Sequence, residues 1–444
     1  MKESLQVVSW LNEYKKNFKL IVEKIKFSES KEWSFIDNKS KLVHRTGGFF
    51  SIVGLKFSSN FYKEKQFFQP IILQPEIGIL GFLAKEENGV LYLLAQAKTE
   101  PGNVGFVQIA PTLQATESNY TALHGGSVPY YLNYFLDTSN HIVLVDQLQS
   151  EQGTRFFKKR NRNMVVLISS TTEIKETIHH RWISIESWKE LLTIDHLVNT
   201  DSKSVIASLL FSSFMQKRSH YCCDEFSNAV QKSFQLTVSA DFILAWISKL
   251  KAHYTLTSEI IPLSNMPSWE ITDTSIKSIL GNYFSIDQFS IYCDSREVSH
   301  WDQPLITSNE KGFVGLFCKI TNGALELLLQ ARVEPGHFDK LELTTTLQIA
   351  IGEQESLSDS TMFMDLLKGD SVKTIIKGLS SEEGGRFNKD ENEYCIVLID
   401  EEPEIELPIN YNWVSFSQLS ELFLLNNFLT NELRSLLALM SSRF

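Results

Sequence analysis

A basic residue and a carboxylate two positions apart, followed by a Pro-Gly turn, occur twice in this sequence of 444 residues. The two segments are Gln96-Ala97-Lys98-x-Glu100-Pro101-Gly102 and Gln330-Ala331-Arg332-x-Glu334-Pro335-Gly336. In a strand, positions i and i+2 lie on one face, so each cation should lie beside its carboxylate. Such a pair can be a solvated ion pair on an edge strand, or a general base with an electrophilic partner. Both interpretations are open at this point.

A second repeated element combines a turn with an arginine. "QSEQGTRFFKKRNRN" (149–163) places Ser150 and Gly153 before Arg155, and "SEEGGRF" (381–387) repeats the arginine as Arg386, again before a Phe. An Arg fork matches phosphate oxygens, and a glycine turn lets backbone N–H groups approach them. In a chain with 42 basic and 53 acidic side chains, this pattern favours a local site for a small anionic ligand. The basic run at 158–162 is more typical of a solvated face.

Aromatic residues stand at a third pair of positions. Trp301 precedes Asp302-Gln303-Pro304, and Phe67 holds the equivalent place before Gln69-Pro70. Beside a diphosphate site, such a ring can stack on a nucleobase. We expect Trp10 and Trp246, which fall on amphipathic helices, to belong to the core instead.

These matches belong to one repeat that runs nearly from end to end. Trp10 recurs as Trp246, an offset of 236, and "GFLAKEENGVLYLLAQAKTEPG" (81–102) recurs without a gap at 315–336, an offset of 234. Beyond the Arg turns the offset is 231. A period above 200 residues means two whole domains rather than a solenoid. We therefore predict a tandem duplication, with domains at 1–211 and 241–444 and a connecting segment at 212–240.

Each half has the pattern of an α+β domain, a strand-rich layer covered by helices. An amphipathic helix opens each half (5–18 and 241–254), and Asn-Gly turns predict β-hairpins at 81–98 and 315–332. "MVVLI" (164–168) and "CIVLI" (395–399) predict buried strands. Helices are expected at 185–192, 202–216, 417–425 and 432–440.

Composition excludes several classes of protein. The net charge of −11 argues against a nucleic-acid-binding protein, and no apolar run is long enough to cross a membrane. The five cysteines contain no CxxC pair, and the start has no signal-peptide pattern, so we expect a soluble, cytoplasmic protein without disulfides. No GxxxxGK[ST], GxGxxG, HExxH or GxSxG motif is present. We expect neither a metal nor a tightly bound organic cofactor.

With these motifs in hand, the sequence resembles a known family. "QPEIGILGFLAKEENGVLYLLAQAKTEPGNVGFVQIAPTLQATESNY" and "VDQLQSEQGTRFFKKRNRNMVV" closely resemble the NDP-hexose 2,3-dehydratases, over nearly the whole chain. The resemblance implies two Nudix-like repeats, a homodimer and no cofactor. The chain has no spaced Glu cluster of the kind that a Nudix metal-binding helix needs, so an active Nudix hydrolase is excluded.

The resemblance also implies which residues form the nucleotide-sugar pockets. One departure affects the second copy: the first half has Thr116, Ser118, Asn119 and Tyr120 after its Thr-Leu-Gln, whereas "TTTLQIAIGEQES" has no Asn-Tyr. One pocket would then be a relic, and the sequence does not say which. The implied substrate-binding residues are Phe67, Ser150, Glu151, Gln152, Gly153, Thr154, Arg155, Trp182, Ser184, Trp301, Gly384, Gly385, Arg386, Asn388, Trp413 and Ser415.

The implied reaction is loss of water across C2 and C3 of dTDP-4-keto-6-deoxy-D-glucose, or of a close nucleotide sugar. A separate 3-ketoreductase would consume the product. For such an elimination, Glu100 or Glu334 is a candidate base, and Lys98 or Arg332 its electrophilic partner. Tyr120, Tyr130 and Tyr131 are alternative proton carriers. The competing interpretation is a non-catalytic nucleotide-sugar binding or regulatory protein on the same scaffold.

Overall fold

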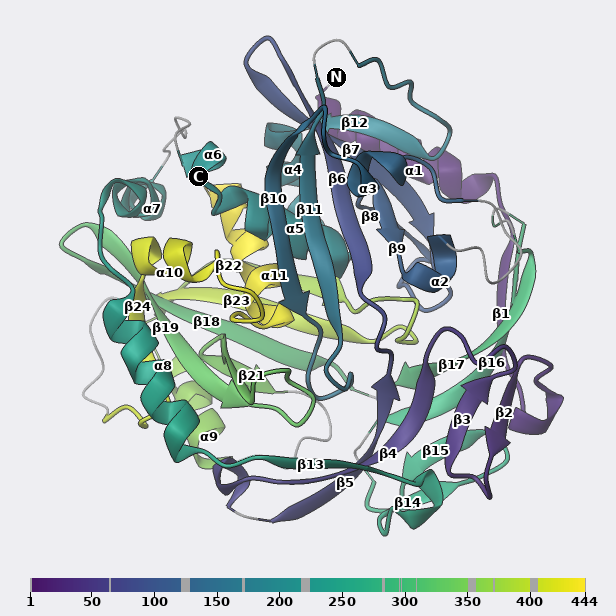
Figure 1. The fold of residues 1–444 in the computed structure, drawn as a ribbon. Helices are drawn as coiled ribbons and strands as arrows, with labels where there is room; N and C mark the ends of the chain where they lie inside the picture. Colours follow the sequence, from purple (N-terminus) through teal and green to yellow (C-terminus); the bar gives the residue numbers. More distant parts are fainter. Residues whose placement is uncertain are drawn as a thin grey trace.

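The computed structural model describes residues 2–63, 65–120, 128–169, 172–216, 224–281, 284–294, 296, 298–308, 310–349, 357–369, 372–399 and 406–443. Within these ranges the protein is a mixed α+β structure with two similar, sheet-rich halves (Figure 1). Each half contributes the whole of one seven-stranded sheet and four of the five strands of a smaller sheet. None of the helices in the described ranges has the length and apolar character needed to span a membrane.

The elements follow the same order in both halves. The first half contains α1 (Glu3–Lys16), β1 (Leu20–Lys24), β2 (Trp33–Ile36), β3 (Lys41–His44), β4 (Ser51–Ser58), β5 (Gln66–Leu73), β6 (Gly78–Glu87), β7 (Val90–Thr99), β8 (Val107–Ala110), β9 (Leu113–Ala115), α2 (Glu117–Tyr120), α3 (Asn133–Leu136), β10 (Ile142–Ser150), β11 (Arg160–Leu167), β12 (His180–Ser184), α4 (Ile185–Leu192) and α5 (Thr200–Leu210). The connecting segment carries α6 (Ser213–Gln216) and α7 (Glu225–Gln235).

The second half repeats the series. It contains α8 (Asp241–His253), β13 (Thr257–Ile261), β14 (Trp269–Ile271), β15 (Ser275–Ser278), β16 (Ser285–Cys293), β17 (His300–Thr307), β18 (Gly312–Thr321), β19 (Ala324–Val333), β20 (Leu341–Thr344), β21 (Leu347–Ile349), α9 (Leu357–Leu367), β22 (Val372–Ser381), β23 (Glu391–Ile399), β24 (Tyr411–Ser415), α10 (Phe416–Leu422) and α11 (Asn431–Met440). The helix expected at 202–216 is interrupted after Leu210, where the Ser212 hydroxyl donates to the Leu209 carbonyl.

Each large sheet is built around the predicted hairpin. β6 and β7 are joined by Asn88-Gly89, and β18 and β19 by Asn322-Gly323; all four turn residues have positive φ, as a type I′ turn requires. β11 runs parallel to β6, and β23 runs parallel to β18. Both edge pairs, β10 with β11 and β22 with β23, even share a register shift at equivalent positions. The hairpin predictions are confirmed.

The small sheets exchange strands between the halves. β1 pairs antiparallel with β16 of the second half, and β13 pairs antiparallel with β4 of the first half (Figure 1). Leu20 and Val22 of β1 pack on Phe289 and Ile291 of the second half. Each small sheet is therefore completed by a strand from the other half.

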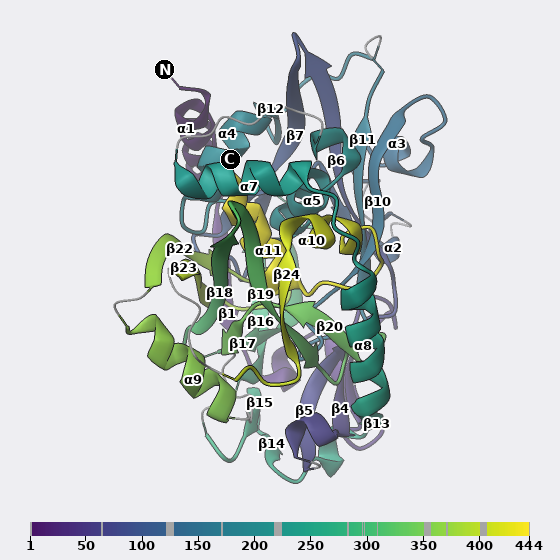
Figure 2. The ribbon, with the colours of Figure 1, turned by 90° about the vertical axis from the view of Figure 1, so that its left-hand side faces the viewer.

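The main hydrophobic core also crosses between the halves. Helices α5 and α11 pack against each other, and one apolar cluster includes Val205 and Leu209 from α5 with Leu433 and Leu436 from α11. Helix α7 of the connecting segment lies against β19 (Figure 2), where the Leu325 N–H donates to the Ser233 hydroxyl at 2.7 Å. Trp10 and Trp246 pack against this core, as the helical pattern predicts.

Candidate active site

The two Arg turns meet the two Pro-Gly turns where the halves join. Turn 1 (150–156) follows β10 and turn 2 (381–387) follows β22. The Gly336 N–H donates to the Gly153 carbonyl at 2.7 Å, and the Gly102 N–H donates to the Gly384 carbonyl at 2.9 Å. A Cβ on Gly102 would lie 2.8 Å from the Gly384 oxygen and closer still to the Phe387 oxygen, so only glycine allows this approach. Each Arg turn is thus held by the Pro-Gly turn of the opposite half.

The cation and the carboxylate that precede each Pro-Gly turn form an ion pair. Lys98 Nζ lies 2.9 Å from Glu100 Oε1, and Arg332 Nε lies 3.2 Å from Glu334 Oε1. Glu100 is 3% exposed and Glu334 is 1% exposed. The alternative of a solvated edge-strand pair is wrong for both copies, because the opposite half covers them.

The two ion pairs differ in their third partner. His337 Nε2 lies 3.1 Å from Glu334 Oε2. Although burial opposes both shifts, the neighbouring carboxylates Glu342 and Glu334 raise the pKa of His337 to about 9, and His337 with Arg332 lowers the pKa of Glu334 to about 2. In the first half the equivalent residue is Asn103, whose Oδ1 accepts from the Gly384 N–H at 3.1 Å. Glu334 is therefore enclosed in a buried ionic triad.

Glu100 instead faces a set of acid–base groups, which we call the first cluster. A Cβ on Gly385 would contact Glu383 Oε1 and would lie 3.5 Å from Glu100 Oε1, so the two carboxyl groups converge beside turn 2. Within the described residues, Glu100 Oε2 accepts no hydrogen bond, which is unusual for a buried carboxylate. The first cluster consists of Lys98, Glu100, Glu151, Lys159, Asp201, Glu383 and Arg386.

Burial shifts the ionisation of this cluster toward neutral pH. It raises the pKa of Glu383 to about 7 against the opposing effect of Arg386. It lowers the pKa of Lys159 to about 8 against the effect of Glu151, and it raises the pKa of Asp201. Groups that titrate near the working pH are suited to proton transfer.

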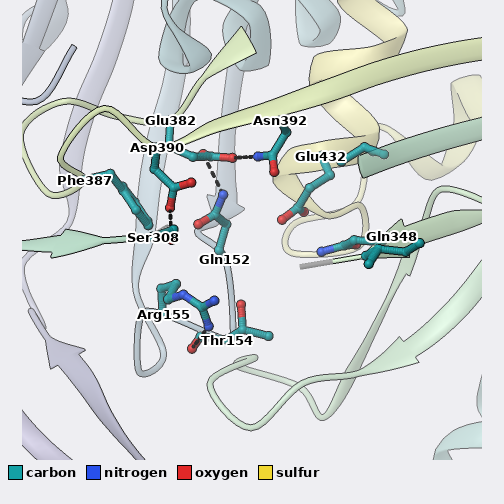
Figure 3. A pocket seen from close by; sticks show the side chains of 12 residues that line it. Gln152, Thr154, Arg155, Ser308, Gln348, Glu382, Phe387, Asp390, Asn392 and Glu432 are labelled. Atoms are coloured by element: carbon teal, nitrogen blue, oxygen red, sulfur yellow. Dashed lines mark hydrogen bonds between the residues drawn. The ribbon is translucent and has the colours of Figure 1, made fainter. Parts of the chain in front are cut away.

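The second cluster surrounds a small cavity of about 40 Å³ (Figure 3). Gln152 Nε2 donates to Glu382 Oε2 at 2.7 Å, and the Ser308 hydroxyl donates to Asp390 Oδ2 at 2.8 Å. Burial raises the pKa of Glu382 and of Asp390. Ligand pockets commonly reach several hundred Å³, so this space takes a few water molecules rather than a nucleotide sugar. Its polar lining is Gln152, Thr154, Arg155, Ser308, Gln348, Glu382, Asp390, Asn392 and Glu432.

The two arginines lie on phenylalanine rings contributed by the opposite half. The Arg155 guanidinium carbon is 4.1 Å from the Phe284 ring centre, and that of Arg386 is 4.3 Å from the Phe50 ring centre. Arg386 also donates to the Gly385 carbonyl at 2.7 Å and to Gln74 Oε1 at 3.1 Å. Stacking of this kind fixes the plane of a guanidinium fork.

Trp301 is connected to turn 2 by hydrogen bonds. Its indole N–H donates to Gln303 Oε1 at 2.8 Å, and Gln303 Nε2 donates to the Gly385 carbonyl at 2.7 Å. In the first half Gln69 Nε2 donates to the Thr154 carbonyl at 2.6 Å, but Phe67 stacks on Phe57 and has no N–H to offer. The aromatic residue is therefore hydrogen-bonded through the glutamine to the Arg turn in the second copy, and it is not in the first copy.

The basic run at 158–162 does not form one basic surface. Arg162 makes a two-bond ion pair with Asp146, and Arg160 lies over the Phe338 ring. Lys159 is buried and donates to the Glu76 carbonyl, which leaves Lys158 as the exposed member. The expectation of a solvated face is thus confirmed for Lys158 and wrong for Lys159, while Arg160 and Arg162 are half-buried.

The two Trp-x-Ser elements lie away from the junction. Trp182 pairs with Leu94, six residues before Glu100, which is about 20 Å along the strand direction. Ser184 caps α4 by accepting from the Ser187 N–H, and Ser415 caps α10 in the same way. Trp182 belongs to an apolar cluster of the first half, and Trp413 packs against the matching cluster of the second half. The structure gives these four residues caps and apolar contacts.

Three further predicted residues are also placed outside the first cluster. Asn388 donates to the Thr307 hydroxyl at 3.4 Å, next to turn 2. Tyr130 is 61% exposed, and Tyr131 donates to the Lys175 carbonyl at 3.2 Å. The side chain of Tyr120 lies outside the described residues.

Asp201 of the first cluster and most of the cavity lining were not predicted, and Glu383 and Lys159 were included only as parts of the turn at 381–387 and of the basic run at 158–162. The repeat offsets carry a signal for several of them: Gln114 matches Gln348 at 234, and Asp201 matches Glu432 at 231. Asp201, Gln348 and Glu432 are buried polar residues. Glu383 could have been found from a difference between the two repeats, because turn 1 has an amide, Gln152, where turn 2 has this carboxyl group.

Comparison with known proteins decides the family. The model of the family described as NDP-hexose 2,3-dehydratase matches residues 4–209 and 240–440. This chain is a member of the NDP-hexose 2,3-dehydratase family. It is 38% identical over 426 residues to a dTDP-4-dehydro-6-deoxy-alpha-D-glucopyranose 2,3-dehydratase from Saccharopolyspora spinosa, a match that covers 94% of this chain and 87% of the relative.

Two further relatives of this dehydratase have the same name. The protein from Streptomyces violaceoruber is 37% identical, over 89% of this chain and 87% of the relative, and the one from Amycolatopsis orientalis is 34% identical, over 97% and 89%. Among solved structures, the chain is similar to the C. elegans Ap4A hydrolase (12% identity, 25% of this chain and 83% of that chain, TM-score 0.18). It is also similar to an ADP compounds hydrolase (15% identity, 34% and 77%, TM-score 0.20). Both TM-scores are too low to support an argument.

Proposed function

We propose that this dehydratase removes water across C2 and C3 of a dTDP-4-keto-6-deoxyhexose, giving a 3,4-diketo-2,6-dideoxy sugar nucleotide for deoxysugar biosynthesis. The observation that carries the proposal is the identity of 34–38% with three 2,3-dehydratases, which extends over both halves of the chain. The substrate named for those relatives is the expected substrate of this chain.

The substrate itself makes the elimination possible. The C4 ketone acidifies the proton on C3, and removal of that proton gives an enolate with the C2 hydroxyl in the β position. A general base, a general acid and a group that stabilises the enolate oxygen are sufficient. The first cluster contains groups of all three kinds.

We place the reaction at the first cluster, with Glu100 as the base and Lys98 as the partner that stabilises negative charge. Each of the two glutamates has one oxygen that accepts no hydrogen bond in the described structure. They differ in their ion pairs: Lys98 lies beside one oxygen of Glu100, whereas both oxygens of Glu334 lie beside cations, Arg332 and His337. Arg386 would bind the diphosphate, and Trp301 would stack on the nucleobase at the other end of the Gln303 link. The cluster's cations, Lys98, Lys159 and Arg386, suit an anionic substrate.

We further propose that the two halves are duplicated Nudix-like domains, with bounds near 1–211 and 241–444, and that the protein acts as a homodimer. The matching order of the strands and the shared register shifts support the duplication. The 3,4-diketo product is chemically reactive, which supports its transfer to a separate 3-ketoreductase.

The test is incubation with dTDP-4-keto-6-deoxy-D-glucose in D₂O, followed by NMR. We expect loss of the C2 hydroxyl and incorporation of deuterium at C2, together with release of one water per sugar. A sample without protein measures spontaneous exchange at C3. Tight binding of the nucleotide sugar without water loss would contradict the proposal and would identify a binding protein instead.

A further inference from the structure

Resting on the dehydration proposed above, we propose that Glu383 is the general acid that protonates the departing C2 hydroxyl, while Glu100 of the opposite half removes the C3 proton. The active site would then take one carboxyl group from each half of the chain. No motif shared by the two halves marks Glu383, because turn 1 has Gln152 there.

The geometry brings the two carboxyl groups to one place. Glu383 comes from turn 2 and Glu100 from the end of the β7 segment, and both lie beside Gly385. The absence of a side chain at Gly385 leaves this position open, whereas turn 1 has Thr154 there. Glu383 and Arg386 are partly exposed, so a substrate can reach Glu383 from the side of turn 2.

The two carboxyl groups have different surroundings. Glu100 lies 2.9 Å from Lys98 Nζ. Burial raises the pKa of Glu383 to about 7, so a large fraction keeps its proton. Two neighbouring carboxyl groups in different environments can act as one base and one acid. The charged groups that act on the pair are Lys98, Glu151, Lys159, Asp201 and Arg386.

The other copy of the junction lacks this pair. Gln152 replaces Glu383, and its amide donates to Glu382 at 2.7 Å. An amide transfers no proton at neutral pH. Glu334, in the place of Glu100, is enclosed by Arg332 and His337. One junction therefore has a carboxyl group in the place of the acid and a glutamate with a single neighbouring cation, and the other has neither.

The proton transfers balance over a full cycle. Glu100 takes the C3 proton, the C3–H electron pair forms the C2=C3 bond through the enolate, and the C2–O bond breaks as Glu383 gives its proton to the leaving hydroxyl. Water leaves. Glu383, now a carboxylate, takes the proton of the C3 enol hydroxyl, and Glu100, whose acquired proton exchanges with solvent, delivers a proton to C2. The 3,4-diketo sugar is formed and both carboxyl groups return to their starting states.

The test uses the full chain with Glu383→Gln, which makes turn 2 like turn 1. In D₂O we expect water loss to fall by about 100-fold or more, because general acid catalysis commonly contributes 10²–10⁴-fold. Deuterium incorporation at C3 of the unreacted substrate should continue within about tenfold of the wild-type rate, since the base remains. Glu100→Gln should abolish both. The matched control is Glu393→Gln, the same change at an ion pair with Lys377, which should keep wild-type activity.

Three further measurements distinguish loss of the acid from misfolding of the protein. Affinity for dTDP should be unchanged in Glu383→Gln, which excludes misfolding, and Glu383→Asp should lose less activity than Glu383→Gln. Wild-type kcat/KM should fall as the pH rises through about 7, and this fall should be absent in Glu383→Gln. Wild-type water loss in Glu383→Gln, or equal losses in the Asp and Gln variants, would overturn the inference. Absence of water loss in the wild type would instead refute the proposed function.

Discussion

Adding one methyl group at Gly102 should separate the two halves at the junction. In Gly102→Ala the new Cβ would lie 2.8 Å from the Gly384 oxygen and closer to the Phe387 oxygen, so the turns must move apart. Two backbone hydrogen bonds would be lost, from Gly102 to Gly384 and from Lys389 to Gly102. At about 1 kcal/mol for each bond and about 1–3 kcal/mol for overpacking, the free energy of unfolding should fall by about 3–5 kcal/mol. That is a large part of a typical total of about 5–15 kcal/mol.

Urea unfolding followed by tryptophan fluorescence measures this loss, and steady-state water loss measures its effect on the site. Activity should fall together with stability, because Gly384 precedes Arg386 in the turn that the contact holds. The control is Gly89→Ala, where a Cβ would meet nothing within 4 Å and only the positive φ opposes the change, by about 1–2 kcal/mol. A Gly102→Ala protein that unfolds within 1 kcal/mol of the wild type would refute this account of the junction.

Four further outcomes are expected. Arg386→Ala should weaken dTDP binding by about tenfold or more in calorimetric titration, with partial recovery in Arg386→Lys, whereas Arg155→Ala should bind dTDP normally. Ser184→Ala and Ser415→Ala should each lower the free energy of unfolding by about 1 kcal/mol in urea titrations and leave kcat/KM unchanged. Because the folded pKa of His337 is raised to about 9, its stabilising contribution should be complete below about pH 6.5 and should be lost as the pH rises through 9; a smaller pH dependence of the urea midpoint in His337→Asn would check this. EDTA should leave turnover unchanged, and metal-dependent recovery of activity would contradict that.

Local patterns predicted the parts of the fold that depend on neighbouring residues. Asn88-Gly89 and Asn322-Gly323 predicted both hairpins because a type I′ turn needs two residues with positive φ. In "QAKTE" the two-residue period of a strand predicted that Lys98 and Glu100 lie on one face, where they form an ion pair.

The strand exchange was not predictable from the same patterns. β1 and β13 have the periodicity of strands, but nothing in five residues specifies whether the partner lies in the same half or in the other. The covering of Glu334 was predictable only in part: His337 is three residues away and Glu342 lies opposite Arg332 in the same half, but turn 1 reaches them only when the halves dock. Ser184 was assigned to the substrate although a helix was expected at 185–192, immediately after it, because an N-cap and a ligand contact use the same hydroxyl.

The strand exchange has a consequence for synthesis of the chain. Val22 of β1 pairs with Ile291, which is 269 residues later in the chain. Leu55 of β4 likewise pairs with Ile260 of the second half. At about 5–20 residues per second, β1 emerges from the ribosome roughly 15–50 s before its partner exists. During that time its backbone edge is open to pairing with other chains. The first half cannot complete its folding before the second half has begun to appear, so this protein should depend on the speed of translation and on chaperones that cover exposed strands.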